Sequence, residues 1–172
     1  FVVISLLTLT ACNKKTADQP ANNQPQKFET EPVEQATGKA ADFVLKSAKG
    51  GQDIKLADYK GKVVIIDFWA TWCAPCRRGV PDLVNLQEKY GNDVVIIGIS
   101  VDTDTKAEVP GFISDYKINY PIAYADQAVV ASYGGVEAIP TSFIIDREGN
   151  IVDKHVGLVD KSVYEAAIAK LK

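Results

Sequence analysis

The stretch that decides the fold is residues 67–76, which read Asp-Phe-Trp-Ala-Thr-Trp-Cys-Ala-Pro-Cys. It continues an aliphatic run, 63–66, and together they predict a strand that is buried on both faces and ends near Ala70. Apolar residues recur at near-helical spacing after Cys73, so Cys73 falls at the start of a helix. Three residues make about one helical turn, which brings the sulfurs of Cys73 and Cys76 onto one face within disulfide reach.

The position of Cys73 at a helix start favours redox chemistry. Free amide groups and the helix macrodipole stabilise an anion there, so we expect a lowered pKa for the Cys73 thiol. Its thiolate would be the nucleophile of disulfide exchange, and Cys76, one turn inside the helix and more shielded, would resolve the mixed disulfide. The alternative is half of a zinc site, which needs four ligands. Cys12 is distant in the sequence from Cys73 and Cys76, and His155 is the only histidine, so four zinc ligands are hard to assemble. We therefore expect no metal, and no cofactor beyond a Cys73–Cys76 disulfide.

The rest of the chain predicts an α/β fold. A second continuous apolar run, 94–99, predicts another strand buried on both faces. Shorter segments alternate between strand and helix patterns, with strands at 43–45, 54–56, 142–145 and 151–153, and helices at 105–116, 128–133 and 163–171. Pro110 must lie near the start of its helix or kink it. We therefore expect a mixed central sheet flanked by helices, with an N-terminal hairpin around a Gly-Gly turn.

The first segment, residues 1–11, is mostly apolar. Eleven residues are too few to span a bilayer, which needs about 20, and they fit the apolar core of a secretory signal peptide. The chain contains no methionine, so we expect the true N-terminus to be missing. The segment ends Leu-Thr-Ala-Cys at Cys12, which resembles a bacterial lipobox, whose cysteine carries lipid and begins the mature protein. The alternative is a buried N-terminal strand with a stray cysteine.

Residues 12–38 have few large apolar side chains, so burial cannot offset chain entropy and we expect a flexible tether. Residues 39–172 form the expected folded domain. Lipid on Cys12 would hold this domain, as a monomer, against a membrane of the bacterial cell envelope, outside the cytoplasm. The net charge of −3, without a basic block, argues against nucleic acid as a partner.

Residues 67–76 resemble the active-site segment of thioredoxins, especially the membrane-associated branch that includes the reductases of cytochrome c maturation. The resemblance covers about residues 40–172. Residues 139–141, Ile-Pro-Thr, resemble the thioredoxin loop whose proline is cis and faces the cysteines. Residues 143–149 resemble the strand and turn that follow, and residues 102–135 resemble the central insertion of this branch. The resemblance implies a thioredoxin fold.

The resemblance also implies roles for individual residues. Cys73 and Cys76 would be the catalytic pair, and Asp67 would match the buried acid that takes the proton from Cys76. Burial inside an apolar strand raises the pKa of a carboxyl group, although Asp67 could instead be a hydrogen-bonded structural residue. Pro81 matches the proline that kinks the active-site helix. Substrate would contact residues around Cys73, beside a cis peptide bond: Trp72, Pro75, Ile139 and Pro140.

Other residues near the motif have plainer interpretations. We expect Trp69 to be a packing residue and Trp72 to be partly exposed. The pair Arg77 and Arg78 could favour a thiolate, but a solvated helix face is the simpler interpretation. Gly79 departs from the anchored reductases, which often carry a glutamate there, and this departure weakens the case for carboxylate-assisted partner recognition. We expect His155 to be an ordinary strand or surface residue, because copper-binding relatives use a different cysteine spacing.

The resulting expectation is an enzyme that reduces disulfides of exported proteins, such as apocytochrome c, and exchanges electrons with a membrane partner. The Ala-Pro between the cysteines resembles the Gly-Pro of thioredoxin, whereas strong oxidants carry a histidine there. A thiol peroxidase of the same fold is an alternative, although Trp72 before Cys73 argues against it. A non-catalytic binding module for exported chains is the other alternative.

Overall fold

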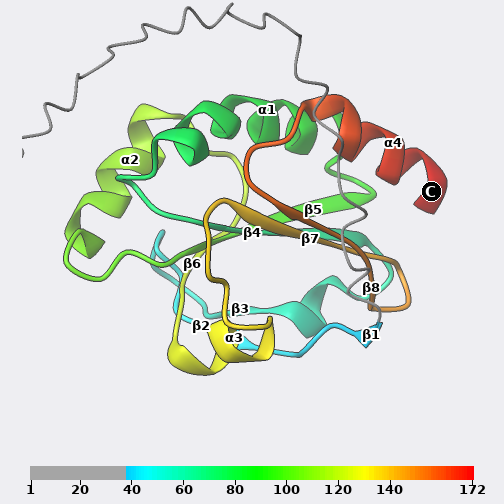
Figure 1. The fold of residues 1–172 in the computed structure, drawn as a ribbon, viewed down its shortest axis with the longest axis horizontal. Helices are drawn as coiled ribbons and strands as arrows, with labels where there is room; N and C mark the ends of the chain where they lie inside the picture. The colour runs from blue at the N-terminus through cyan, green and yellow to red at the C-terminus, as the bar shows by residue number, and fades with distance from the viewer. Residues whose placement is uncertain (1–37) are drawn as a thin grey trace, which may run out of the picture. The chain divides into compact units, whose positions relative to one another are not determined.

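The computed structural model describes residues 38–172, so the expected signal peptide, Cys12 and nearly all of the tether lie outside the described residues. Within this range a six-stranded mixed sheet forms the centre of the fold (Figure 1). Its strands, in spatial order, are β1 (Gly38–Lys39), β8 (Asn150–Val156), β7 (Thr141–Ile145), β4 (Val63–Trp69), β5 (Val94–Ser100) and β6 (Ile122–Tyr124). The three strands β4, β5 and β6 are parallel, whereas β7 runs antiparallel to β4, and β8 to β7.

The two predicted buried strands, β4 and β5, are neighbours near the centre of the sheet, and all of their residues are buried. Their continuous apolar sequence follows from this place, because both faces of a parallel pair are covered. Two positions break the run of large apolar side chains, and they lie opposite each other: Asp67 of β4 pairs with Gly98 of β5.

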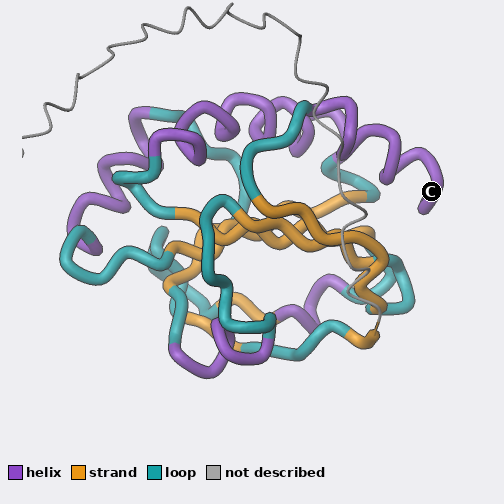
Figure 2. Tube along the Cα trace, viewed as in Figure 1, coloured by secondary structure: helices purple, strands orange, loops and turns teal. Residues whose placement is uncertain are grey.

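Helices cover one face of the sheet and a mixed layer covers the other (Figure 1; Figure 2). The first layer holds α1 (Ala74–Tyr90), α2 (Val109–Asp115) and α4 (Lys161–Leu171). The second holds the hairpin of β2 (Val44–Leu45) and β3 (Ile54–Lys55), the short η1 helix (Leu56–Tyr59) and α3 (Gln127–Ser132). Each layer packs a separate apolar core against the sheet, which confirms the predicted α/β architecture and the N-terminal hairpin.

The segment after the hairpin strand β2 reaches the outer edge of β6. The amide of Ala48 donates to the carbonyl of Ile122 at 2.8 Å, and the amide of Tyr124 donates to the carbonyl of Lys46 at 2.9 Å. These bonds cover a strand edge that would otherwise expose unpaired backbone groups. The sequence did not predict β6, because three residues are too short a run to show a strand periodicity.

The predicted helix at 105–116 is wrong as a single element. The structure has a short η2 helix at Lys106–Glu108, and α2 begins afresh at Val109 with Pro110 in its first turn. Proline lacks the amide hydrogen that an interior helical position requires, but that hydrogen has no partner at a helix start. Pro110 therefore starts a helix here instead of kinking one. No helix within residues 38–172 is both long and apolar enough to cross a membrane.

Candidate active site

The two cysteines lie where β4 passes into α1. Cys73 is the N-cap residue of α1, and its sulfur accepts a hydrogen bond from the amide of Cys76 at 3.2 Å. The two sulfurs form a disulfide across one helical turn, with Pro75 in the first turn between them. The predicted pairing and its place at a helix start are both confirmed. The first amide groups of α1 are therefore directed at the sulfur of Cys73, where they can stabilise a thiolate.

The expected difference in shielding between the two cysteines is wrong for this disulfide form. Cys73 and Cys76 are each only 4 % exposed. The accessible feature is the neighbouring Trp72, which is 62 % exposed, whereas Trp69 is buried as predicted. Both cysteines of the disulfide are therefore buried, and the next residue before Cys73, Trp72, is exposed.

A loop that is distant from Cys73 in the sequence faces it in the structure. The peptide bond between Ile139 and Pro140 is cis, which confirms the prediction from resemblance. The carbonyl oxygen of Ile139 lies 3.7 Å from the sulfur of Cys73. The carbonyl of Pro140 is already taken, because it accepts from the amide of Gly157 at 2.7 Å. Thus Trp72, Cys73 and Ile139, which are up to 67 positions apart in the chain, meet at one edge of the sheet.

Asp67 shares a cavity with Cys76. Its side chain is buried in β4, and burial raises the pKa of its carboxyl group from 3.8 to about 7. A small cavity of about 20 Å³ connects it with Cys76, and its walls include Gly79, Asp82, Pro140, Leu158 and Tyr164. That volume is enough for about one water molecule. The structure thus brings Asp67, Cys76 and Pro140 to one cavity, and the carboxyl group can hold or release a proton near neutral pH.

Two buried tyrosines are affected by Asp67. Burial, together with the charge of Asp67, raises the pKa of Tyr120 and of Tyr164. The hydroxyl of Tyr164 lies 3.0 Å from the hydroxyl of Ser142. Sequence reasoning missed Tyr164 and Leu158 as cavity walls, because each is more than 80 residues from Cys76 and lies in or before α4.

Among the other residues weighed from the sequence, Arg77 and His155 have polar contacts and Gly79 has a packing contact. Arg77 and Arg78 lie on an exposed face of α1, as the simpler interpretation predicted, and Arg77 donates to the hydroxyl of Tyr116 at 3.0 Å. His155 lies in β8, with its Nε2 atom 3.2 Å from Asp153. Gly79 faces Leu158, since a Cβ atom at Gly79 would come within 2.9 Å of the Leu158 side chain. A glutamate at position 79 would therefore need Leu158 to move.

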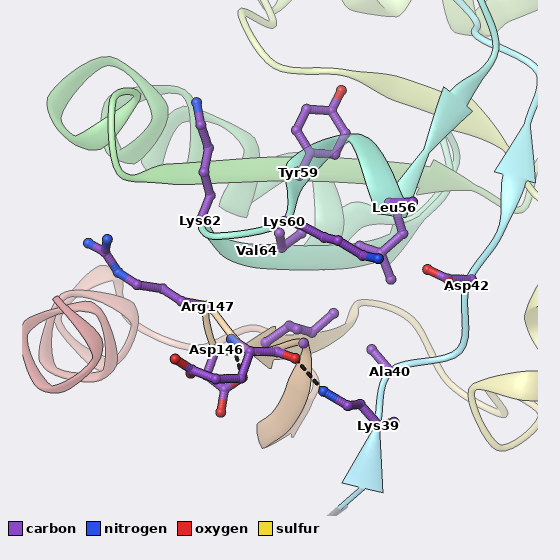
Figure 3. Close-up of a pocket in the computed structure, with 14 residues that line it drawn as sticks. Lys39, Ala40, Asp42, Leu56, Tyr59, Lys60, Lys62, Val64, Asp146 and Arg147 are labelled. Atoms are coloured by element: carbon purple, nitrogen blue, oxygen red, sulfur yellow. Dashed lines mark hydrogen bonds between the residues drawn. The ribbon is translucent and has the colours of Figure 1, made fainter.

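A much larger cavity within residues 38–172 lies elsewhere. It has a volume of about 410 Å³ and lies between the β7–β8 turn and the η1 segment (Figure 3). Charged side chains of both signs surround an apolar floor, among them Lys39, Lys60, Asp146 and Arg147 (Figure 3). It contains neither cysteine and none of the predicted site residues, so cavity size does not locate the reactive site. Within residues 38–172, no group of three or more His, Cys, Asp or Glu side chains could hold a metal ion.

Three features together define the class of protein to which this chain belongs. They are a redox-capable cysteine pair at a helix start, a loop with a cis proline, and a buried acid within the sheet of an α/β fold. The sequence profile of the Redoxin family matches residues 35–168, and the chain belongs to this family. It has the thioredoxin fold with a mixed central sheet, and it is a thiol–disulfide oxidoreductase.

Particular relatives agree with this class. The chain is 33 % identical over 172 residues to the thiol–disulfide oxidoreductase ResA of Bacillus cereus, covering 99 % of this chain and 95 % of that protein. The structure of a thiol:disulfide interchange protein of the thioredoxin family from Chlorobium tepidum has a TM-score of 0.72 and 30 % identity, covering 78 % of this chain and 96 % of that one. The exposed lipoprotein thioredoxin of Streptococcus pneumoniae has a TM-score of 0.67 and 28 % identity, covering 76 % of this chain and all of that one.

Proposed function

We propose that this protein is a lipid-anchored, extracytoplasmic reductase that transfers two electrons from the Cys73/Cys76 dithiol to disulfides of exported proteins. The observation that carries the proposal is the position of the Cys73 sulfur. It caps α1 and lies 3.7 Å from the carbonyl oxygen of Ile139. A nucleophile stabilised by a helix amide and bordered by the backbone carbonyl of Ile139 is suited to attack a disulfide within an extended chain.

The first step would be attack by the Cys73 thiolate on one sulfur of the substrate disulfide. A Cys73–substrate mixed disulfide forms, and the other substrate sulfur leaves as a thiolate. Trp72, Pro75, Ile139 and Pro140 would contact the substrate on either side of the attacking sulfur. The 62 % exposure of Trp72 supports this role, because a large apolar side chain at the surface gains free energy when a substrate covers it.

The second step would be resolution by Cys76. Its thiol loses a proton to Asp67 and attacks Cys73, which forms the Cys73–Cys76 disulfide and releases the second substrate thiolate. The substrate gains two electrons and the dithiol loses two. The shared cavity and the raised pKa of Asp67, about 7, support a proton acceptor at this place. Reduction of the new disulfide would require a membrane electron donor.

The proposed anchor is lipid on Cys12, after the signal segment 1–11 and before the tether 12–38. One similarity supports it: a structural relative is described as an exposed lipoprotein thioredoxin. Cys12→Ser should abolish incorporation of labelled palmitate, whereas globomycin, which blocks cleavage of the signal peptide after lipid attachment, should leave a labelled protein of higher mass. Incorporation of labelled palmitate by Cys12→Ser equal to that of the unmodified protein would remove the anchor from the proposal.

Trapping tests the catalytic proposal. In cells, Cys76→Ser should accumulate mixed disulfides between Cys73 and exported proteins, with apocytochrome c a specific candidate. The double variant Cys73→Ser/Cys76→Ser is the matched control and should trap nothing. Equal trapping by both variants would contradict attack by Cys73. Peroxide consumption by the unmodified protein would favour a peroxidase instead.

The direction of electron flow is tested by titration of the purified domain in glutathione buffers. We expect a reduction potential closer to the value for thioredoxin, about −270 mV, than to the value for a strong oxidant, about −120 mV. A potential near the oxidant value would overturn the reductase direction but not the thiol–disulfide chemistry.

A further inference from the structure

A second buried carboxylate, Asp102, lies next to the redox loop. It follows the end of β5 by two residues and is only 6 % exposed. Within residues 38–172 no lysine, arginine or histidine forms a salt bridge with it. A buried charge without a counter-ion needs several hydrogen-bond donors to be tolerated. Asp102 was not singled out from the sequence.

Asp102 obtains these donors from two loops. The amide of Thr71 lies 3.1 Å from each carboxylate oxygen, and the hydroxyl of Thr71 donates at 2.5 Å. The hydroxyl of Ser100 donates at 2.8 Å, and the hydroxyl of Thr105 donates from the loop before η2. Asp102 therefore links the loop between β4 and α1, through Thr71, to the first loop of the central insertion, through Thr105.

The Thr71 loop is short and leads directly to the reactive sulfur. Thr71 is two residues before Cys73 and is itself buried. The amide of Cys73 donates back to the carbonyl of Ala70 at 3.2 Å, so the loop turns tightly after the strand. Because Cys73 begins α1, a shift of Thr71 moves Cys73 and the helix start together. The contact between Cys73 and Ile139 joins two different elements, and it depends on that position.

The bond between the Cys76 amide and the Cys73 sulfur behaves differently. Both atoms belong to the first turn of α1, so their geometry is set within the helix itself. Displacement of the whole helix start would preserve this bond and the thiolate stabilisation that it provides. The reactivity of the thiolate and its position relative to Ile139 are thus separable properties.

We propose that Asp102 is a positioning residue that holds Thr71, and through it Cys73, at the correct distance from the Ile139 edge for a protein substrate. The inference rests on the proposed function, since it concerns the site where an extended substrate would pair. Asp102 does not touch the reacting sulfurs. It acts through four donors on one carboxylate, and it couples the insertion to the redox loop.

The test compares two disulfide substrates with the same reduced protein. Insulin, as a protein disulfide, would use both Cys73 and the Ile139 edge, whereas the small aromatic disulfide DTNB needs only the thiolate. In Asp102→Asn, the amide group turns a donor toward other donors and loosens the loop. We expect the rate constant for insulin to fall about tenfold to a hundredfold, and the rate constant for DTNB to change by less than about threefold.

Three further variants separate positioning from folding. Asp146→Asn changes a carboxylate that accepts from Glu148 and Asn150 in the β7–β8 turn, so it is the matched control and should lower neither rate. Thr71→Val should reproduce the selective loss for insulin, whereas Thr71→Ser retains the hydroxyl and should restore most of it. Thermal unfolding of every variant shows which fraction is folded at the assay temperature.

The outcomes are distinct. A selective loss for insulin in Asp102→Asn and Thr71→Val, with rescue by Thr71→Ser, supports the inference. Equal losses for insulin and DTNB, in proportion to the unfolded fraction, would overturn it and leave Asp102 a purely structural residue. If the unmodified protein reduces neither substrate, the proposed function fails first. If the unmodified protein is active and Asp102→Asn matches Asp146→Asn, only the positioning role fails.

Discussion

The carboxyl group of Asp67 and the sulfur of Cys76 line one buried cavity, although Asp67 belongs to a central strand and Cys76 to the first turn of a helix. The relationship exists because β4 runs directly into α1, so the helix begins over the end of its own strand. Burial raises the pKa of Asp67 to about 7, so its carboxyl group can exchange a proton near neutral pH. The shared cavity places this exchange close to Cys76. The site therefore combines a nucleophile beside the exposed Trp72 with a proton carrier that is buried in the central strand.

Asp67 should make the stability of the disulfide form depend on pH. Its pKa is raised from 3.8 to about 7 by burial, so the folded protein binds a proton more tightly than the unfolded chain does. The free energy of unfolding should therefore decrease as the pH rises from about 4 to about 7, by roughly 4 kcal/mol at most. Asp67→Asn should abolish this part of the pH dependence in urea titrations and be more stable than the unmodified protein at pH 8. Asp82→Asn, at the wall of the same cavity, should retain the slope.

The kinetics of Asp67→Asn should separate the two chemical steps. Attack by Cys73 on a substrate disulfide should be little changed, whereas resolution by Cys76 should slow about tenfold or more, because a positioned base contributes roughly that factor or more. Rapid-quench mass spectrometry would show a longer-lived mixed disulfide. Asp82→Asn is again the control and should resolve at the unmodified rate. Equal lifetimes in all three proteins would exclude a proton-transfer role for Asp67.

Two glycines should respond in opposite ways to alanine. At Gly79, in α1, the new Cβ meets only the far end of the Leu158 side chain, which is 44 % exposed and can move. Gly79→Ala should therefore stabilise the protein by about 0.5–1 kcal/mol, the gain expected for alanine in a helix interior. At Gly98 the Cβ would come within 2.5 Å of Ile122 and 3.0 Å of Trp69, both buried.

Gly98→Ala should therefore destabilise the protein by about 1–3 kcal/mol, since the packed core beneath it has no free space. Chemical denaturation of both variants under identical conditions checks the pair. If alanine changed the free energy of unfolding in the same direction at Gly79 and at Gly98, the packing around one of them would differ from that described.

Trp72→Ala should weaken substrate reduction without affecting the fold. The side chain is 62 % exposed, so its removal leaves the free energy of unfolding within about 0.5 kcal/mol. The rate constant for a protein disulfide should fall several-fold, because the apolar surface that a substrate would cover is lost. Trp72→Phe should retain most of the rate. If Trp72→Ala lowered the thermal stability as much as truncation of the buried Trp69 is expected to, the assignment of Trp72 to the surface would be contradicted.

Much of the fold could be predicted from local pattern. β4 follows from an apolar run that only Asp67 interrupts, and α1 follows from a near-helical spacing after Cys73. The parts that local pattern missed are short or depend on distant partners. β6 has three residues, and it forms because β5 and the segment after β2 pair with it on either side.

The sequence by itself determined the chemistry: a Cys-x-x-Cys pair at a helix start, an acid within a buried strand, and an Ile-Pro loop. Residue type and helical spacing suffice for that, because the sulfurs are one turn apart in any helix. Only the tertiary structure decided which distant groups meet. The approach of Ile139 to Cys73 was expected from resemblance, whereas Tyr164 and Leu158 around the Asp67 cavity, and Asp102 bonded to Thr71, emerged only from the order of the strands in the sheet. Such contacts join segments more than 30 residues apart, and no local periodicity encodes them.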